Sequence, residues 1–251
     1  MLRACPIPLR LGFRLAAVLA VAWLLLPEAD AAAAGYRLVG WNNLGMHCMD
    51  ADFAVMSILP PFNTIQAQLV DPSGHLVKTP GAITVTYEAV ADPAGSINTT
   101  SAGKTNFWSH EDGLFGVDLP VDQGLGGFSM PGTSNTPQLM TFDPATSEFM
   151  AVGIPITPYD DAGKKNTYPM MRLVARDGSG NLLASTNIVL PVSDEMSCKS
   201  CHASGIGTEA RPSSGWANDP DAERDVRLNI LRLHDDRQRD VQRFQEALAE
   251  V

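Results

Sequence analysis

The 251-residue chain lacks several features that would place it in a common functional class. It contains no G-x-S-x-G, no H-E-x-x-H and no phosphate-binding loop, so the usual hydrolase, zinc-protease and nucleotide-binding motifs are missing. Basic residues are scarce: 18 Lys and Arg against 28 Asp and Glu give a net charge of −10. An acidic chain of this kind argues against nucleic acid and against anionic membranes as partners.

The chain also lacks an apolar run long enough to span a membrane. Its longest apolar run lies near the N-terminus. Residues 15–26 form an apolar run of about 12 residues, preceded by three arginines. Small-residue A-x-A patterns follow at Ala29–Ala31 and Ala32–Ala34. This layout predicts a secretory signal peptide over 1–34, because the run is shorter than the roughly 20 residues that span a bilayer. We therefore expect export to the periplasm, the cell surface or the medium, with no membrane span in the mature chain.

Cysteine is rare, with 4 in the chain, but two of them form a recognisable motif. Cys198, Cys201 and His202 give the pattern C-x-x-C-H, the attachment signature of a c-type haem. Two thiols must reach the vinyl groups of one porphyrin edge while an imidazole binds the iron. Positions i, i+3 and i+4 share one face of a helical turn, so five residues supply all three groups. The motif predicts one covalent haem with His202 as proximal ligand, and no role for spacers Lys199 and Ser200.

The same cysteines could instead form a dithiol, or half of a zinc site. A four-ligand zinc site would require a second close pair of ligands, and the other cysteines, Cys5 and Cys48, lie far apart. Haem is therefore favoured, and a non-haem binding module with a disulfide, zinc or redox site is the alternative. Removal of residues 1–34 would leave Cys48 unpaired in an oxidising compartment, which is unusual.

A second cluster of soft ligands occurs near the N-terminus of the mature chain. It comprises Met46, His47, Cys48 and Met49. These side chains could bind Cu(I), or one could supply a distal ligand to the haem. Neighbouring side chains of a strand point in opposite directions, so at most two could converge on one metal. The end of a core-lining strand is the favoured interpretation, with a copper-handling protein as an alternative.

The sixth iron ligand has two candidates, His234 and His47. His234 lies one residue from the apolar stripe of a predicted helix, where its ring could turn towards a haem edge. The alternative interpretation of His234 is a solvated side chain next to two aspartates, which would favour the protonated ring. His75 and His110 occur in polar, loop-like contexts and are expected on the surface.

Residues 35–192 are rich in β-branched residues, Gly and Pro, which favours strands separated by turns. The predicted strands are Tyr36–Trp41, Thr64–Val70, Ile83–Ala91, Met170–Ala175 and Leu182–Leu190. Glycines in 176–181 indicate a hairpin turn between the last two. We predict a mainly β protein: an antiparallel, Ig-like β-sandwich over 35–192, with a Gly-rich insertion between residues 95 and 158.

Residues 193–251 are predicted to be a haem-binding helical segment. Asn218–Pro220 resembles a helix start, with acidic residues in the following turn. Apolar residues then recur at steps of three and four, which predicts one or two amphipathic helices. The stripe consists of Val226, Ile230, Leu233, Val241, Phe244 and Leu248. No later segment covers it, so it packs on the sandwich or on a partner, or the natural protein continues past Val251.

Several stretches resemble the exported multihaem c-type cytochromes of metal- and sulfur-respiring bacteria. They are Trp41–Asp50, Ser57–Pro61, Gly103–Trp108, Ile156–Asp161, Val192–Met196 and Leu228–Asp235. The haem motif predicts one-electron transfer, with redox proteins and other haem-bearing segments or subunits as partners. An enzyme built around the haem, such as a reductase with an open distal site, is the less favoured alternative. Members of that family look longer, with more C-x-x-C-H motifs after the equivalent of Asp235. This chain has one, so it is either a short form or the N-terminal part of a multihaem protein.

Overall fold

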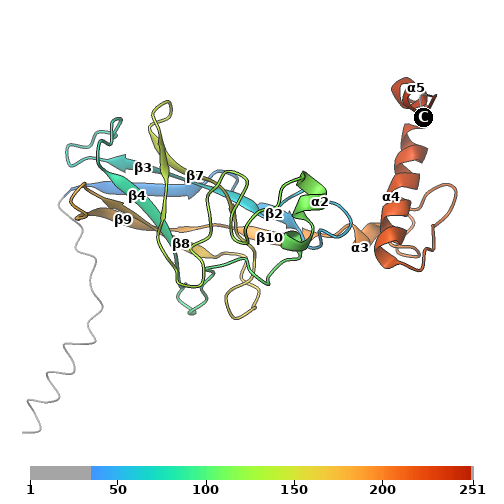
Figure 1. Ribbon diagram of the computed structural model, residues 1–251, viewed down its shortest axis with the longest axis horizontal. Helices are drawn as coiled ribbons and strands as arrows, with labels where there is room; N and C mark the ends of the chain where they lie inside the picture. Colours follow the sequence, from blue (N-terminus) through green and yellow to red (C-terminus); the bar gives the residue numbers. More distant parts are fainter. Residues whose placement is uncertain (1–34, 250–251) are drawn as a thin grey trace, which may run out of the picture.

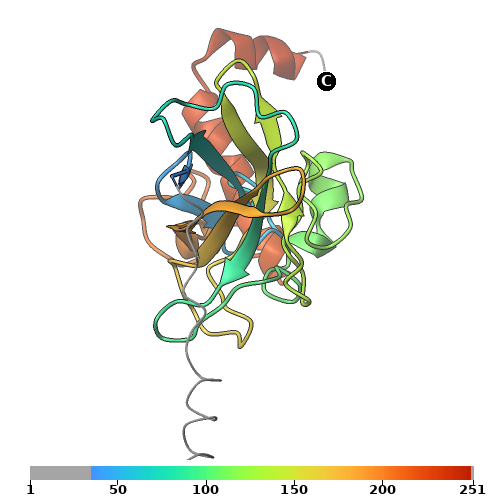
Figure 2. The ribbon, with the colours of Figure 1, turned by 90° about the vertical axis from the view of Figure 1, so that its left-hand side faces the viewer.

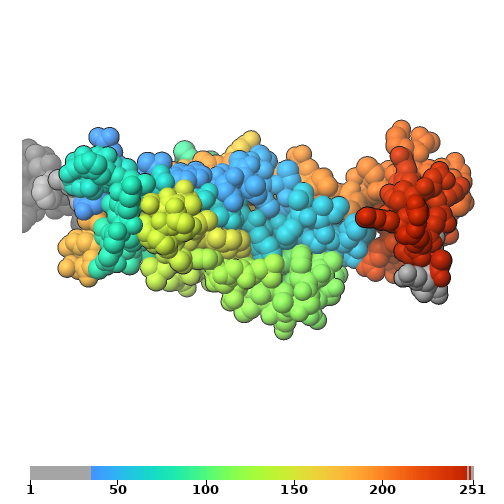
Figure 3. All heavy atoms as spheres, turned by 90° about the horizontal axis from the view of Figure 1, so that it is seen from above, coloured from blue at the N-terminus to red at the C-terminus, as the bar shows by residue number. Residues whose placement is uncertain are grey.

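The computed structural model describes residues 35–249, so the predicted signal peptide over 1–34 lies outside the described residues. Strand accounts for 30% of the described residues and helix for 17%, which confirms the mainly β prediction. The β part and the helical part follow one another along an elongated molecule, as the ribbon and the space-filling view both show (Figures 1 and 3).

Two four-stranded antiparallel sheets form most of the β part. The first has the order β1 (Arg37–Asn42), β3 (Phe62–Val70), β7 (Glu148–Pro155), β6 (Thr141–Asp143). The second has the order β5 (Gln138–Leu139), β4 (Thr84–Val90), β8 (Met170–Arg176), β9 (Leu182–Val189). A separate parallel pair joins β2 (His47–Asp50) to β10 (Val192–Met196). Figure 2 looks along the long axis from the end that carries the larger sheets.

The larger sheets share one apolar core, which follows from alternation of side chains along each strand. In β4, Val85, Tyr87 and Ala89 are buried while their neighbours are more exposed. Strand β1 lies close against β8 because Gly40 has no side chain: a Cβ there would lie 2.3 Å from Leu173 Cδ1. Larger residues at position 40 would therefore force the two strands apart.

All five predicted strands are present, with ends shifted by a residue or two. The predicted hairpin between β8 and β9 is confirmed, and Gly180 adopts a φ of 84° in its turn. Strand β7 was not predicted, because it lies in the Gly-rich insertion and contains Gly153 at a φ of 75°. Such a residue breaks the alternation by which a strand is recognised.

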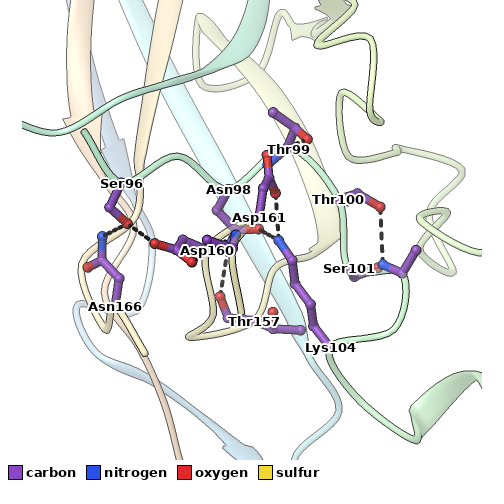
Figure 4. A network of polar contacts seen from close by, with 12 residues as sticks. Ser96, Asn98, Thr99, Thr100, Ser101, Lys104, Thr157, Asp160, Asp161 and Asn166 are labelled. Carbon is purple, nitrogen blue, oxygen red and sulfur yellow. Dashed lines mark hydrogen bonds and ion pairs between the residues drawn. The ribbon is translucent and has the colours of Figure 1, made fainter. Parts of the chain in front are cut away.

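Polar side chains, of which Asn98 and Thr157 are buried, hold the Gly-rich insertion in place (Figure 4). The Lys104 ammonium contacts the Asp161 carboxylate at 2.7 Å and the Asn98 side-chain oxygen at 2.8 Å. The Asn98 amide in turn donates to the Thr157 carbonyl at 2.7 Å. These contacts tie the start of the insertion, which precedes its first regular element, to the loop after β7.

A second, smaller apolar cluster lies beside β2 and β10. It consists of Met49, Phe53, Phe107 and Val192. Phe53 and Phe107 pack edge to face with ring centroids 5.1 Å apart. Phe107 belongs to the 3₁₀ turn η1 (Phe107–Ser109), which precedes the short helix α2 (Glu111–Phe115). This cluster anchors the end of the β part from which the helical part projects (Figure 1).

The chain after β10 contains α3 (Lys199–His202), α4 (Ala222–Gln238) and α5 (Gln242–Ala249), which confirms helices in this segment. The predicted start at Asn218–Pro220 is wrong, because Asn218 has a left-handed φ of 50°. Asp221 is the cap instead: its carboxylate accepts from the backbone N–H groups of Glu223 and Arg224 at 3.0 and 2.9 Å. Of the helices within 35–249, none has the length and apolar character needed to cross a membrane.

Candidate cofactor-attachment site

The C-x-x-C-H motif forms a single helical turn at the narrow junction between β10 and α4 (Figure 1). The His202 backbone N–H donates to the Cys198 carbonyl at 2.9 Å, and the Cys201 N–H lies 3.3 Å from the same oxygen. Strand β10 leads directly into this turn and pairs Met196 with Asp50 of β2. The expected i, i+3, i+4 spacing is therefore realised on one helical face.

The two thiols of the motif are free and reachable. Cys198 is partly buried, Cys201 is exposed, and neither forms a disulfide. Burial, together with the nearby carboxylates of Asp50 and Asp52, raises the pKa of the Cys198 thiol. Cysteines of dithiol-exchange sites have lowered pKa values instead, so Cys198 does not have the electrostatics of an activated redox thiol.

His202 completes the motif with a neutral imidazole. Partial burial lowers the pKa of the ring below its usual value of 6.5, because desolvation disfavours the charged form. The Nδ1 atom is buried and has no hydrogen-bond partner. A neutral imidazole is the form that ligates a metal, so His202 fits the part of an axial ligand.

The spacer residue Lys199 has a structural role that the sequence analysis did not assign to it. Its ammonium forms an ion pair with Asp52, in the loop that follows β2. Burial acts to raise the pKa of Asp52, but hydrogen bonds from Lys199, the Ala54 N–H and the Asn106 amide outweigh it and lower the pKa to about 2. The pair ties the motif to the β part.

Helix α4 makes a second link to the same loop. The Arg227 guanidinium donates to the Ala54 carbonyl. Beside this contact lies a cavity of about 430 Å³, lined in part by Phe53, His110 and Leu114. His110, which was expected on the surface, thus borders a hollow between α2 and α4. The loop after β2 is the common support for both α3 and α4.

His47 does not come into contact with the motif. The residue is 7% exposed, and its Nε2 lies 2.9 Å from the Pro60 carbonyl. Burial lowers the pKa of this imidazole, and the hydrogen bond to Pro60 only partly offsets that effect. Ligation by His47 would require this hydrogen bond to break.

His234 is also separate from the motif. Its side chain is 56% exposed and lies near Asp235 and the Phe244 ring. With 3.6 residues per turn, it lies roughly 140° around α4 from Asn229, whose side chain contacts the His202 carbonyl. The structure joins Cys198, Cys201 and His202 but brings neither candidate sixth ligand to them, so that ligand stays a prediction.

Strand β2 divides the soft-ligand cluster between two faces. His47 and Met49 are buried, whereas Met46 and Cys48 are exposed. Across residues 35–249, no three or more His, Cys, Asp or Glu side chains gather closely enough to hold a metal ion. This geometry matches the core-lining interpretation of the stretch and does not assemble the copper ligands.

A row of polar side chains on α4 was missed by sequence reasoning, which followed the apolar stripe alone. The row consists of Asp225, Asn229, Arg232 and Asp236, and each of its members bonds to the loop 203–221. The spacing of four, three and four is the available signal, because it places all four on one helical face.

A scan against protein-family models and a search of curated proteins both found no match for this chain. The residues of the chain itself therefore carry the functional conclusion.

Proposed function

We propose that this chain is an exported c-type cytochrome that carries one haem and transfers electrons between redox partner proteins. The observation that carries the proposal is the C-x-x-C-H turn, with two free thiols and a neutral His202 within one helical turn. Cys198 and Cys201 would hold the porphyrin through thioether bonds, and His202 would be the proximal ligand. The haem, when bound, supplies a one-electron centre.

The chain's own residues hold the attachment turn in a defined place. Lys199 is paired with Asp52, and the Ala51 N–H donates to the Met196 carbonyl at 2.8 Å. Both contacts fix the turn against the loop after β2. A cofactor attached there would keep a constant orientation to the β part, which favours a reproducible distance to a redox partner.

The scarcity of apolar burial after β10 also supports a cofactor. Among the described residues that follow Val192, only Pro212 and Val226 are buried apolar residues. Small segments with so little core are usually stabilised by a disulfide, a metal or another cofactor. A porphyrin attached at Cys198 and Cys201 would supply the missing apolar surface.

The finer organisation belongs to the same proposal. The two larger sheets would form an Ig-like sandwich over 35–192, and 193–251 would be the haem-bearing segment, exported by the signal peptide over 1–34. Leu231 and Val241 on the helical part are 58% and 42% exposed. They offer apolar contact to another haem-bearing segment or subunit, as expected for the N-terminal part of a multihaem protein.

The alternatives are less well supported. A redox dithiol would require an activated thiol, whereas the pKa of Cys198 is raised. A zinc site would require further close ligands, which the described residues do not gather. A copper site would require Met46, His47, Cys48 and Met49 to converge, whereas the structure places two of them on the buried face and two on the exposed face.

The test is an absorption spectrum and an intact mass of the protein exported in a host that matures c-type cytochromes. We expect a sharp reduced α-band and a mass increase of one haem. The double variant Cys198→Ser, Cys201→Ser should lose both signals, whereas the matched control Cys48→Ser, at an exposed free cysteine outside the motif, should keep them. His202→Ala should keep the haem attached and change its ligand-field bands.

A colourless wild-type protein at the bare mature mass would contradict the proposal. It would instead favour a β-sandwich binding module in which Cys198 and Cys201 form a disulfide or bind a metal. Haem loss in the Cys48→Ser control would show that attachment is not specific to the motif.

A further inference from the structure

The polar row on α4 binds backbone atoms of the loop that follows the attachment turn. Asp225, at 6% exposure, accepts from the Ser204 hydroxyl at 2.6 Å and from the Ser204 N–H at 2.8 Å. It also accepts from the Asp219 N–H at 2.9 Å. One buried carboxylate therefore joins the beginning and the end of the loop 203–221.

Asn229 extends this contact to the attachment turn itself. The side chain is completely buried, and its Nδ2 donates to the His202 carbonyl and to the Ser204 hydroxyl, each at 3.0 Å. Its Oδ1 accepts from the Ala217 N–H at 2.8 Å. His202 is the last residue of α3, and the final carbonyls of a helix have no partner within it. Asn229 supplies that partner from another helix.

A chemically matched contact occurs further along the same helix. Asp236 accepts from the N–H and the hydroxyl of Ser213, the latter at 2.6 Å. It is thus a second Asp–Ser pair between α4 and the loop. The Asp236 pair has no contact with His202 or Ser204 and lies at a more exposed position. The chain therefore contains its own control for the Asp225 pair.

We propose that Asn229, together with Ser204 and Asp225, positions the axial histidine of the haem through its backbone. This inference rests on the proposed function. A fixed His202 carbonyl restricts the backbone that carries the imidazole, so less freedom is lost when the ring binds iron. Residues that orient a metal ligand without touching the metal typically contribute 10- to 100-fold to its binding.

The test is an acid titration of the ferric absorption spectrum of the haem-loaded full chain. Protonation of the imidazole competes with iron, so a weaker iron–histidine bond breaks at a higher pH. The haem would stay covalently attached, so the spectrum would report loss of iron ligands without loss of haem. The charged groups that face the turn are Asp50 and Asp52 from the β part, Lys199 in the turn, and Glu223 and Asp225 on α4. The serine variants below keep all of them.

The variants are Ser204→Ala and its matched control Ser213→Ala. We expect Ser204→Ala to raise the pH midpoint of histidine release by about one unit, which corresponds to a roughly tenfold weaker bond. Ser213→Ala should leave the midpoint at the wild-type value. Asn229→Leu, which removes the donor and keeps the volume, should shift the midpoint at least as far as Ser204→Ala. If Asn229→Leu does not fold, the comparison of Ser204→Ala with Ser213→Ala is sufficient to test the positioning role.

Equal midpoints for Ser204→Ala and Ser213→Ala would overturn the positioning role, whether both shift or neither does. In that outcome the haem would still be present, and the proposed function would stand. A wild-type protein without haem would overturn the proposed function, and the positioning role with it.

Discussion

The β part and the helical part are held together by different forces. In residues 35–192, side chains such as Ile65, Tyr87 and Leu173 are buried in one apolar core. In the described residues after Val192, burial of polar groups prevails: Asn229 is completely buried, and its amide contacts backbone atoms of the loop. The same chain thus contains one region stabilised mainly by burial of apolar surface and another stabilised mainly by directional hydrogen bonds.

The difference determines what each region can provide. Apolar burial is non-directional and tolerates small rearrangements, so it suits a scaffold. A hydrogen bond from a buried amide specifies one backbone atom at one distance, so it suits a turn that must present Cys198, Cys201 and His202 in fixed positions. The proposed haem segment gains its geometry from a few contacts, and each of them is open to a test by mutation.

The largest effect is expected from a deletion in the apolar core. Leu173→Ala removes a completely buried side chain that packs against Gly40 of β1. We expect a loss of about 3 kcal/mol in the free energy of unfolding, from lost burial and the cavity that remains. Urea unfolding followed by intrinsic fluorescence measures it. A loss below 1 kcal/mol would show that the sheets can collapse around the cavity.

A matched pair of valines compares the two regions directly. Val85 and Val226 are both almost completely buried, in β4 and α4. Each Val→Ala change should lower the free energy of unfolding of its own region by about 2 kcal/mol. Val85→Ala should lower the urea midpoint of the β part, and Val226→Ala should increase hydrogen exchange in α4 while leaving that midpoint unchanged. If Val226→Ala lowers the midpoint as Val85→Ala does, the two regions unfold as one unit.

The smallest effect concerns the ion pair that joins the regions. The folded-state pKa of Asp52, about 2, lies below its ordinary 3.8. Its contribution to stability is therefore complete above roughly pH 4 and is lost as the pH falls through 2. We expect Asp52→Asn to cost about 1 kcal/mol or less at pH 7, because the Lys199 side chain is 38% exposed and water screens the pair.

The measurement for Asp52 is hydrogen exchange of the α3 amides at pH 7 and urea unfolding between pH 5 and 2. The difference in the free energy of unfolding between wild type and Asp52→Asn should decrease as the pH falls from 5 to 2. Asp235→Asn, at an exposed carboxylate outside the junction, is the control and should match the wild type. A difference that persists unchanged at pH 2 would contradict the assigned role of the carboxylate.

Sequence reasoning succeeded where one local signal matches the fold. Alternation in β4 and the glycine turn before β9 are such signals, and both elements are present. It failed for β7, where Gly153 interrupts the alternation, and for the start of α4, where Asp221 rather than Asn218 is the cap. In both of these cases a backbone conformation with positive φ decided the outcome. Strand β10 (Val192–Met196) was also missed, because most of it lies in the segment predicted to be helical.

At the site, only the local geometry of the C-x-x-C-H turn was predictable from the sequence. The spacing of Cys198, Cys201 and His202 implies one face of a helical turn, and α3 has that form. The partners of this turn, Asp52 and Asn229, come from distant parts of the chain. Hydrogen bonds of this kind depend on how distant elements pack, so no local sequence pattern predicts them. The apolar periodicity of α4 drew attention away from the polar row on the same helix.

The parallel pairing of β2 with β10 has a consequence for the order in which the chain folds. The pair joins residues near the start of the described chain to those just before the attachment turn, and contacts so distant in sequence close slowly. The β8–β9 hairpin, whose strands are adjacent in sequence, should be protected first in a pulse-labelling refolding experiment. Under the proposed function, the turn that carries Cys198 and Cys201 would then be fixed late in folding, so its backbone would still be adaptable when the haem is attached.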